Sequence, residues 1–232
     1  LAASPVKLTG KVVADVQVGG TLFDWAPRGR LRAGRVNVLG RAVDRSEVRF
    51  HTDDQGRLDW EGELLGGAAK VGGRLSLHGE QPYDLHADFD DFPADIFYPF
   101  GADGTRLEAT LSGELELAGH LGDDPTPVDV EARFDRVRVA WNGHELENEE
   151  DWLVAVHGRS VQVPGLSLSD GGRTRLGLEG WTTGDGRVNF RGGGGFDLDL
   201  ARIFAPGVPL AEGTGTLDVE FSPTAGPHGF RA

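Results

Sequence analysis

The sequence of 232 residues contains no cysteine, no methionine and almost no helical periodicity. Without cysteine the chain can form neither a disulfide framework nor a thiolate metal site. No apolar run approaches the roughly 18 residues that a membrane-spanning helix needs, and no signal peptide stands at the start. Because position 1 is leucine rather than methionine, we expect the sequence to be an internal piece of a longer protein.

Positive charge is also in short supply. Lysine and arginine number 23 against 37 acidic residues, so the formal net charge is −14. Such a surface repels phosphate backbones, and nucleic acid is therefore not expected as a partner. Anionic membrane surfaces repel it in the same way.

Glycine and two-residue alternation are what the sequence has in abundance. Glycine accounts for 36 residues, and apolar residues alternate with charged or small ones in segments such as "RLDWEGEL" (57–64) and "TLDVEF" (216–221). This pattern is typical of antiparallel strands with one apolar and one wet face. The sequence therefore predicts an all-β fold, with short helical turns only near Pro93–Tyr98 and Leu200–Phe204.

Several segments recur about 100 residues apart. Phe89–Pro99 is echoed by Phe196–Pro206, and Asp15–Leu22 by Glu114–Leu121. We interpret 1–232 as a single continuous fragment of tandem repeats, with approximate repeats at 1–107 and 108–221. Repeats of this kind stack along an axis and share one continuous apolar stripe.

Motifs that carry chemistry are not evident. None of the seven histidines has a metal-ligand spacing. The acidic stretch "DFDDFPADIF" (88–97) lacks the calcium-loop pattern, so we interpret it as a polar edge leading into a helical turn. The stretch "RGGGGF" (191–196) lacks the lysine of a phosphate loop, and we expect a bulge or loose strand end there. We therefore predict no enzyme, no metal and no cofactor.

The order of these segments resembles the TamB family of bacterial envelope proteins. A motif of alternating leucines flanked by glycines occurs as "AKVGGRLSLHG" (69–79) and "ATLSGELELAG" (109–119). The succession of strands over Pro127–Gly180 and the stretch Asp199–Phe221 are similar to the same family, whose style the AsmA-like proteins share. The likeness covers nearly the whole chain, although each motif alone is weak.

The resemblance implies an elongated, strongly curved antiparallel sheet folded lengthwise into an apolar trough, or β-taco. It also implies a periplasmic location, in a parent protein anchored in the inner membrane of a diderm bacterium. The expected function is lipid transfer, with phospholipid acyl chains shielded in the groove between the inner and outer membranes. A barrel-assembly protein of the outer membrane is expected as a partner, through parts of the parent outside this fragment.

On this interpretation the alternating apolar residues line the trough. The predicted lining residues are Val16, Val18, Val36, Val38, Val48, Phe50, Leu58, Trp60, Leu75, Leu77, Leu115, Leu117, Val137, Val139, Val154, Val156, Val161, Val163, Leu176, Leu178, Leu217 and Val219. Two alternatives stay open: a scaffold that helps outer-membrane β-barrel proteins assemble or translocate, and a solenoid spacer or adhesin with a dry core. Alternating valine and leucine usually make an ordinary sandwich core, and the slender residues and the absence of long polar connections weaken that interpretation without excluding it.

Overall fold

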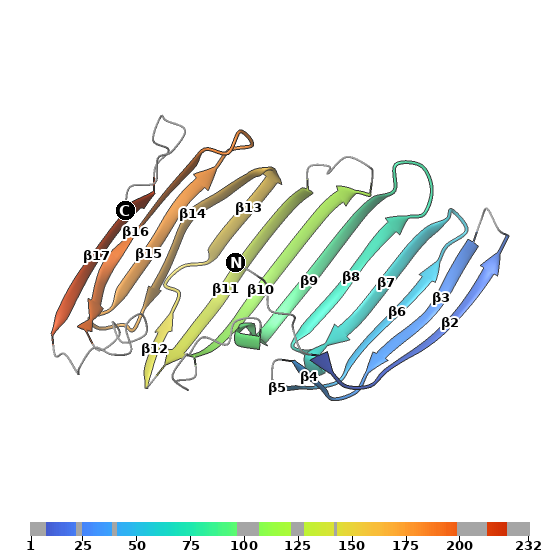
Figure 1. Cartoon of the computed structure of the whole chain (residues 1–232), viewed down its shortest axis with the longest axis horizontal. Coiled ribbons are helices and arrows are strands. Elements are labelled where there is room, and N and C mark those ends of the chain that lie inside the picture. The colour runs from blue at the N-terminus through green and yellow to red at the C-terminus, as the bar shows by residue number, and fades with distance from the viewer. Residues whose placement is uncertain are drawn as a thin grey trace. The chain divides into compact units, whose positions relative to one another are not determined.

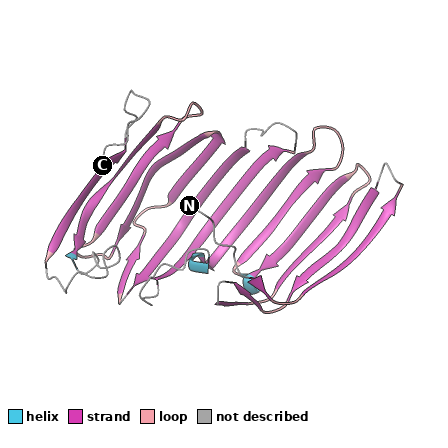
Figure 2. Cartoon of the chain, viewed as in Figure 1, coloured by secondary structure: helices cyan, strands magenta, loops and turns pink. Residues whose placement is uncertain are grey.

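The computed structural model describes residues 8–21, 25–38, 41–96, 107–121, 128–141, 143–198 and 213–221. The chain divides into two compact units, the first made of Leu1–Pro99 with Thr110–Thr126 and the second of Phe100–Ala109 with Pro127–Ala232. In both units the described elements are antiparallel strands, and the first unit also has short 3-10 turns (Figures 1 and 2). The all-β, antiparallel prediction is confirmed.

The main sheet of the first unit follows chain order, so that each strand pairs with the one before it. Its strands are β2 (Val12–Gly20), β3 (Trp25–Ala33), β6 (Ser46–Thr52), β7 (Arg57–Leu64), β8 (Ala69–Ser76), β9 (Pro82–Pro93) and β10 (Leu107–His120), the last from Thr110 onward. A small separate sheet joins β1 (Leu8–Thr9), β4 (Val36–Val38) and β5 (Arg41–Val43). Among the described residues β2 pairs only with β3, so β2 forms an open edge.

The second unit repeats this meander with one variation. Its strands are β11 (Val128–Trp141), β12 (His144–Glu147), β13 (Trp152–Gly158), β14 (Ser160–Ser169), β15 (Arg175–Thr182), β16 (Val188–Asp197) and β17 (Thr214–Phe221). The short strands β12 and β13 both pair with β11, β12 along its C-terminal part and β13 along its N-terminal part. Both also pair with β14, and the order then follows the chain to β17.

The change from β13 to β12 coincides with an irregularity in β11. Asp135 and Arg136 are both exposed, which shifts the alternation of buried and exposed residues by one. Asn148 satisfies the backbone there, because its side-chain oxygen accepts from the Val137 N–H at 2.6 Å and its amide nitrogen donates to the Asp135 carbonyl at 3.1 Å. A bulge normally leaves backbone groups unpaired, and this one amide compensates for them.

An aspartate and a glycine form the hairpin between β6 and β7. The Asp53 carboxylate accepts from the backbone N–H groups of Gln55 and Arg57 at 2.8 and 2.9 Å and pairs with the Arg57 guanidinium. Gly56 closes the turn at a φ of 71°, where a residue with a Cβ would be strained. Mainly because the Arg57 N–H donates to it, the Asp53 carboxyl has its pKa lowered to about 2.

The structure differs from one local prediction and confirms part of another. The glycines of Arg191–Phe196 form neither a bulge nor a loose end, since they lie inside β16 and pair without interruption with β15 and β17. The turn expected near Pro93–Tyr98 is a 3-10 turn at Ala94–Ile96, and the one expected at Leu200–Phe204 lies outside the described residues. A second 3-10 turn covers Leu65–Gly67. Among the described residues no helix is long and apolar enough to cross a membrane.

Because of Asp53, we expect the stability of the first unit to vary with pH in the acid range. Its folded pKa of about 2 lies below the ordinary value of 3.8. The charged carboxylate therefore adds stability above pH 4, and this contribution disappears as the pH falls through 2. For Asp53→Asn we expect the loss in unfolding free energy relative to wild type to be largest above pH 4 and to shrink toward pH 2. Urea denaturation at a series of pH values measures this, and a loss that does not vary with pH would contradict it.

Candidate functional site

Strand register gathers the apolar residues on one face of each sheet. Residues directly opposite each other on paired strands project to the same side. In the first unit one such row runs Val16, Gly29, Phe50, Trp60, Gly73, Leu85 and Leu117 across the sheet from β2 to β10. Each member is apolar or glycine, so no charged side chain interrupts the row.

The same pairing defines the whole face, which we call the apolar face of each unit. In the first unit it comprises Val12, Ala14, Val16, Val18, Trp25, Pro27, Gly29, Leu31, Ala33, Val48, Phe50, Leu58, Trp60, Gly62, Leu64, Ala69, Val71, Gly73, Leu75, Tyr83, Leu85, Ala87, Phe89, Gly113, Leu115, Leu117 and Gly119, with Ser46 and Thr52 among them. In the second unit it comprises Val128, Val130, Ala132, Phe134, Val137, Val139, Trp141, Leu146, Trp152, Val154, Val156, Val161, Val163, Leu166, Leu168, Leu176, Leu178, Gly180, Val188, Phe190, Gly192, Gly194, Phe196, Gly215, Leu217, Val219 and Phe221, with His144 and Thr182 among them.

Most of the predicted lining residues lie on these faces, and three do not. Val36 and Val38 belong to the small sheet through β4. Leu77 follows the end of β8, where its backbone N–H donates to the Gly56 carbonyl at 3.0 Å. The predicted set also omitted residues such as Leu31 and Leu85, although "RGRLRA" and "YDLHADF" carry the same alternation.

The apolar faces are poorly buried. At the edges Val16 and Leu217 are each 48% exposed and Val18 is 65% exposed. Toward the middle most members are half-buried by their neighbours on the same face. One compact cluster forms at Ala69 and Phe92, against which residues such as Leu64 and Leu111 pack. In an ordinary domain a second layer covers such a face.

The opposite faces carry charge. In the first unit Asp59 pairs with Arg74 at 2.7 Å and Asp15 with Arg30 at 3.4 Å, each across neighbouring strands. Exposed pairs like these contribute little stability. They do make this face strongly hydrophilic, so the two sides of the sheet differ sharply in polarity.

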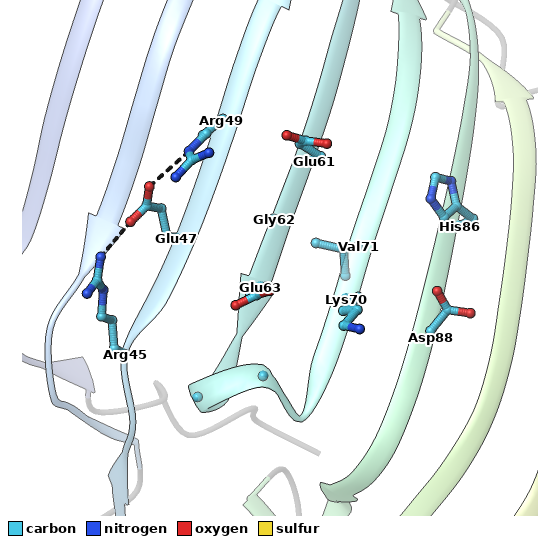
Figure 3. Close-up of a pocket in the computed structure, with 12 residues that line it drawn as sticks. Arg45, Glu47, Arg49, Glu61, Gly62, Glu63, Lys70, Val71, His86 and Asp88 are labelled. Atoms are coloured by element: carbon cyan, nitrogen blue, oxygen red, sulfur yellow. Dashed lines mark hydrogen bonds and ion pairs between the residues drawn. The ribbon is translucent and has the colours of Figure 1, made fainter.

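A hollow of about 710 Å³ lies on the charged face of the first unit (Figure 3). Glu47 lies between Arg45 and Arg49, at 2.7 and 3.0 Å, and their hydrogen bonds lower the pKa of its carboxyl. Lys70 and Asp88 line the same hollow. Four acidic and three basic side chains line it, and they supply neither a nucleophile with an adjacent base nor a set of metal ligands. Among the described residues no three His, Asp or Glu side chains are placed to hold a metal ion.

On the apolar faces, aromatic rings lie across glycines of the neighbouring strand. Trp60 is opposite Gly73, and a Cβ on Gly73 would meet the ring at 2.8 Å. Tyr83 lies over Gly119 and Phe196 over Gly215 in the same way. Because these rings lie flat along the sheet, they cover the backbone of the neighbouring strand and project little above the apolar face.

Adding a methyl group at one of these glycines should disturb this surface. In Gly73→Ala the new Cβ would collide with the Trp60 ring and with the Asp84 carbonyl. We expect the free energy of unfolding to fall by about 1–3 kcal/mol, with a change in near-UV circular dichroism as the indole shifts. Gly34→Ala is the control, since nothing lies within 4 Å of its Cβ position, and it should change stability by less than about 0.5 kcal/mol. Equal effects of the two substitutions would contradict the packing described.

Comparison with known proteins assigns no family to this arrangement. No protein-family model, curated protein or solved structure matches the chain. The resemblance to the TamB family therefore stays a prediction. The candidate site is defined by its own geometry: an apolar face in each unit that no described element of that unit covers, backed by a charged face.

Proposed function

We propose that this chain is a segment of a lipid-transfer protein of the bacterial envelope, in which acyl chains rest against the apolar faces. One observation carries the proposal: among the described residues of each unit no second layer covers its apolar face, and Val16 and Leu217 are each 48% exposed. Monomeric soluble proteins seldom leave a contiguous apolar area of this kind without a ligand or partner. In the proposed trough, the sheet folds lengthwise so that its apolar side encloses the chains.

The energetics suit a hydrocarbon cargo. Exposure to water costs roughly 0.8 kcal/mol per methylene, so an acyl chain of about 16 carbons faces a barrier of about 12 kcal/mol outside a membrane. A continuous apolar surface removes most of that barrier. Valine and leucine offer contacts without directional bonds, so a chain can slide past one row of residues to the next without breaking specific interactions.

The charged faces have a separate role in this proposal. They keep the outer side of the sheet solvated, and the net charge of −14 makes the chain as a whole repel anionic head groups. A transfer surface works better when the head group stays in water and only the tail is bound. The membranes joined would be the inner and outer membranes of a diderm bacterium, as the resemblance to TamB implies.

A second candidate function has its own observation. Every residue of β2, Val12–Gly20, is exposed, and this edge strand has neither the proline nor the lysine that commonly protect a sheet edge. An incoming strand could add to it by backbone pairing, as a scaffold for outer-membrane β-proteins would require. Cross-links from β2 to nascent β-protein rather than to lipid would favour this function over lipid transfer.

Two valines of β2 offer a matched test of acyl binding. Val16 lies on the apolar face and Val13 on the opposite one, and they are 48% and 41% exposed. Titrating the purified chain with a fluorescent fatty acid of 16 carbons should give saturable binding, which Val16→Asp weakens about tenfold at that end of the face because a carboxylate replaces an apolar contact. Val13→Asp should bind as wild type, and circular dichroism should show both variants folded. The absence of binding, or equal weakening by both substitutions, would contradict the proposal.

A further inference from the structure

One tryptophan breaks the division between apolar and charged faces. Trp181 of β15 alternates with Gly180 and Thr182, which lie on the apolar side, so its indole projects from the charged face of the second unit. It is 39% exposed. The chain has five tryptophans, and the ring of this one is placed where packing against the apolar face cannot account for it.

Two side-chain amides flank this ring in register. Gln162 of β14 lies directly opposite Trp181 on one side, and Asn189 of β16 lies directly opposite it on the other. In the part of the chain that the structure describes, neither side-chain amide makes a hydrogen bond, whereas Asn148 uses both ends of its amide. An amide has two donor hydrogens and one acceptor oxygen. The row thus presents an aromatic surface between two sets of free donors and acceptors.

A second row completes the site. Glu179, Arg191 and Glu220 lie opposite one another on β15, β16 and β17, next to the first row on the same face. The pairing of β14 with β15 shifts in register between Val163 and Leu166, and Pro164 lies within this part of β14. The two rows and Pro164 line a hollow of about 470 Å³, which is within the size range of small-molecule sites. Register irregularities of this kind are common beside binding sites.

We propose that this hollow binds a neutral saccharide, with a sugar ring stacked on Trp181. A pyranose has an apolar C–H face and a rim of hydroxyl groups, which match an indole surface flanked by amides and carboxylates. Two glutamates against one arginine leave the site with a negative charge, which opposes phosphate or carboxylate ligands. An acyl chain would leave the two amides unsatisfied. The site lies on the face opposite the one proposed to hold lipid, so the two proposals stand independently.

The indole N–H signals provide a direct test. In a ¹H–¹⁵N spectrum the chain gives at most five such signals, one for each tryptophan, and Trp181→Phe identifies the relevant one. Titration with chitotetraose or cellotetraose should move the Trp181 signal saturably at millimolar concentrations, and leave the signals of Trp25 and Trp60, on the apolar face, in place. Inorganic phosphate serves as the anionic comparison and should move none of them.

Variants then separate stacking from hydrogen bonding. Calorimetry should show that Trp181→Ala weakens binding of the active oligosaccharide at least about tenfold, and that Gln162→Ala and Asn189→Ala each weaken it by a smaller factor. Trp25→Ala, which removes a tryptophan that is 50% exposed on the apolar face, should leave it unchanged. The proposal is overturned if neither oligosaccharide moves the Trp181 signal, if phosphate alone moves it, or if the amide variants and Trp181→Ala bind as wild type.

Discussion

The structure depends on one constraint: the strands of each unit pair so that their alternating apolar residues project to the same face. A shift of one residue at any pair would carry apolar side chains of the following strands to the charged side. Where register does shift, the chain compensates locally. Asn148 covers the break in β11, and the Ser112 hydroxyl accepts from the Asp91 N–H at 3.0 Å where β9 and β10 slip. Most apolar side chains therefore stay on one face on both sides of these irregularities.

This constraint leaves each unit with half of a normal core. A sheet usually covers its apolar face with helices or a second sheet, and the described residues provide neither. Stability must then come from cross-strand pairs, from rings laid over glycines such as Gly73, and from hairpins like the one capped by Asp53. The cost is an apolar surface in contact with water. The proposed function removes this cost, because a bound acyl chain and the apolar face both lose contact with water, which is favourable for each.

Alternation alone was enough to predict the all-β class and the side on which most of the proposed lining residues project. Alternation was not enough to predict features that depend on which strands pair with one another. The four glycines from Gly192 suggested a loose end, yet β15 and β17 hold them in a regular strand, because glycine accepts strand geometry when both neighbours supply hydrogen bonds. Leu77 fits the pattern but falls in a turn. Trp181 violates the pattern, and this aromatic residue at a polar position of "LGLEGWTT" was the available sequence signal for the proposed saccharide site.

Two neighbouring residues of β13 allow the central claim to be measured directly. Val156 projects from the apolar face and Ala155 from the opposite one, and both are half-buried. A photo-reactive amino acid placed at each position, in the protein expressed in a diderm bacterium, reports what contacts each face. The account predicts cross-links to phospholipid from position 156 and none from position 155. Cross-links from position 156 only to other residues of the same chain would mean that the apolar face is a dry core, and would contradict the account.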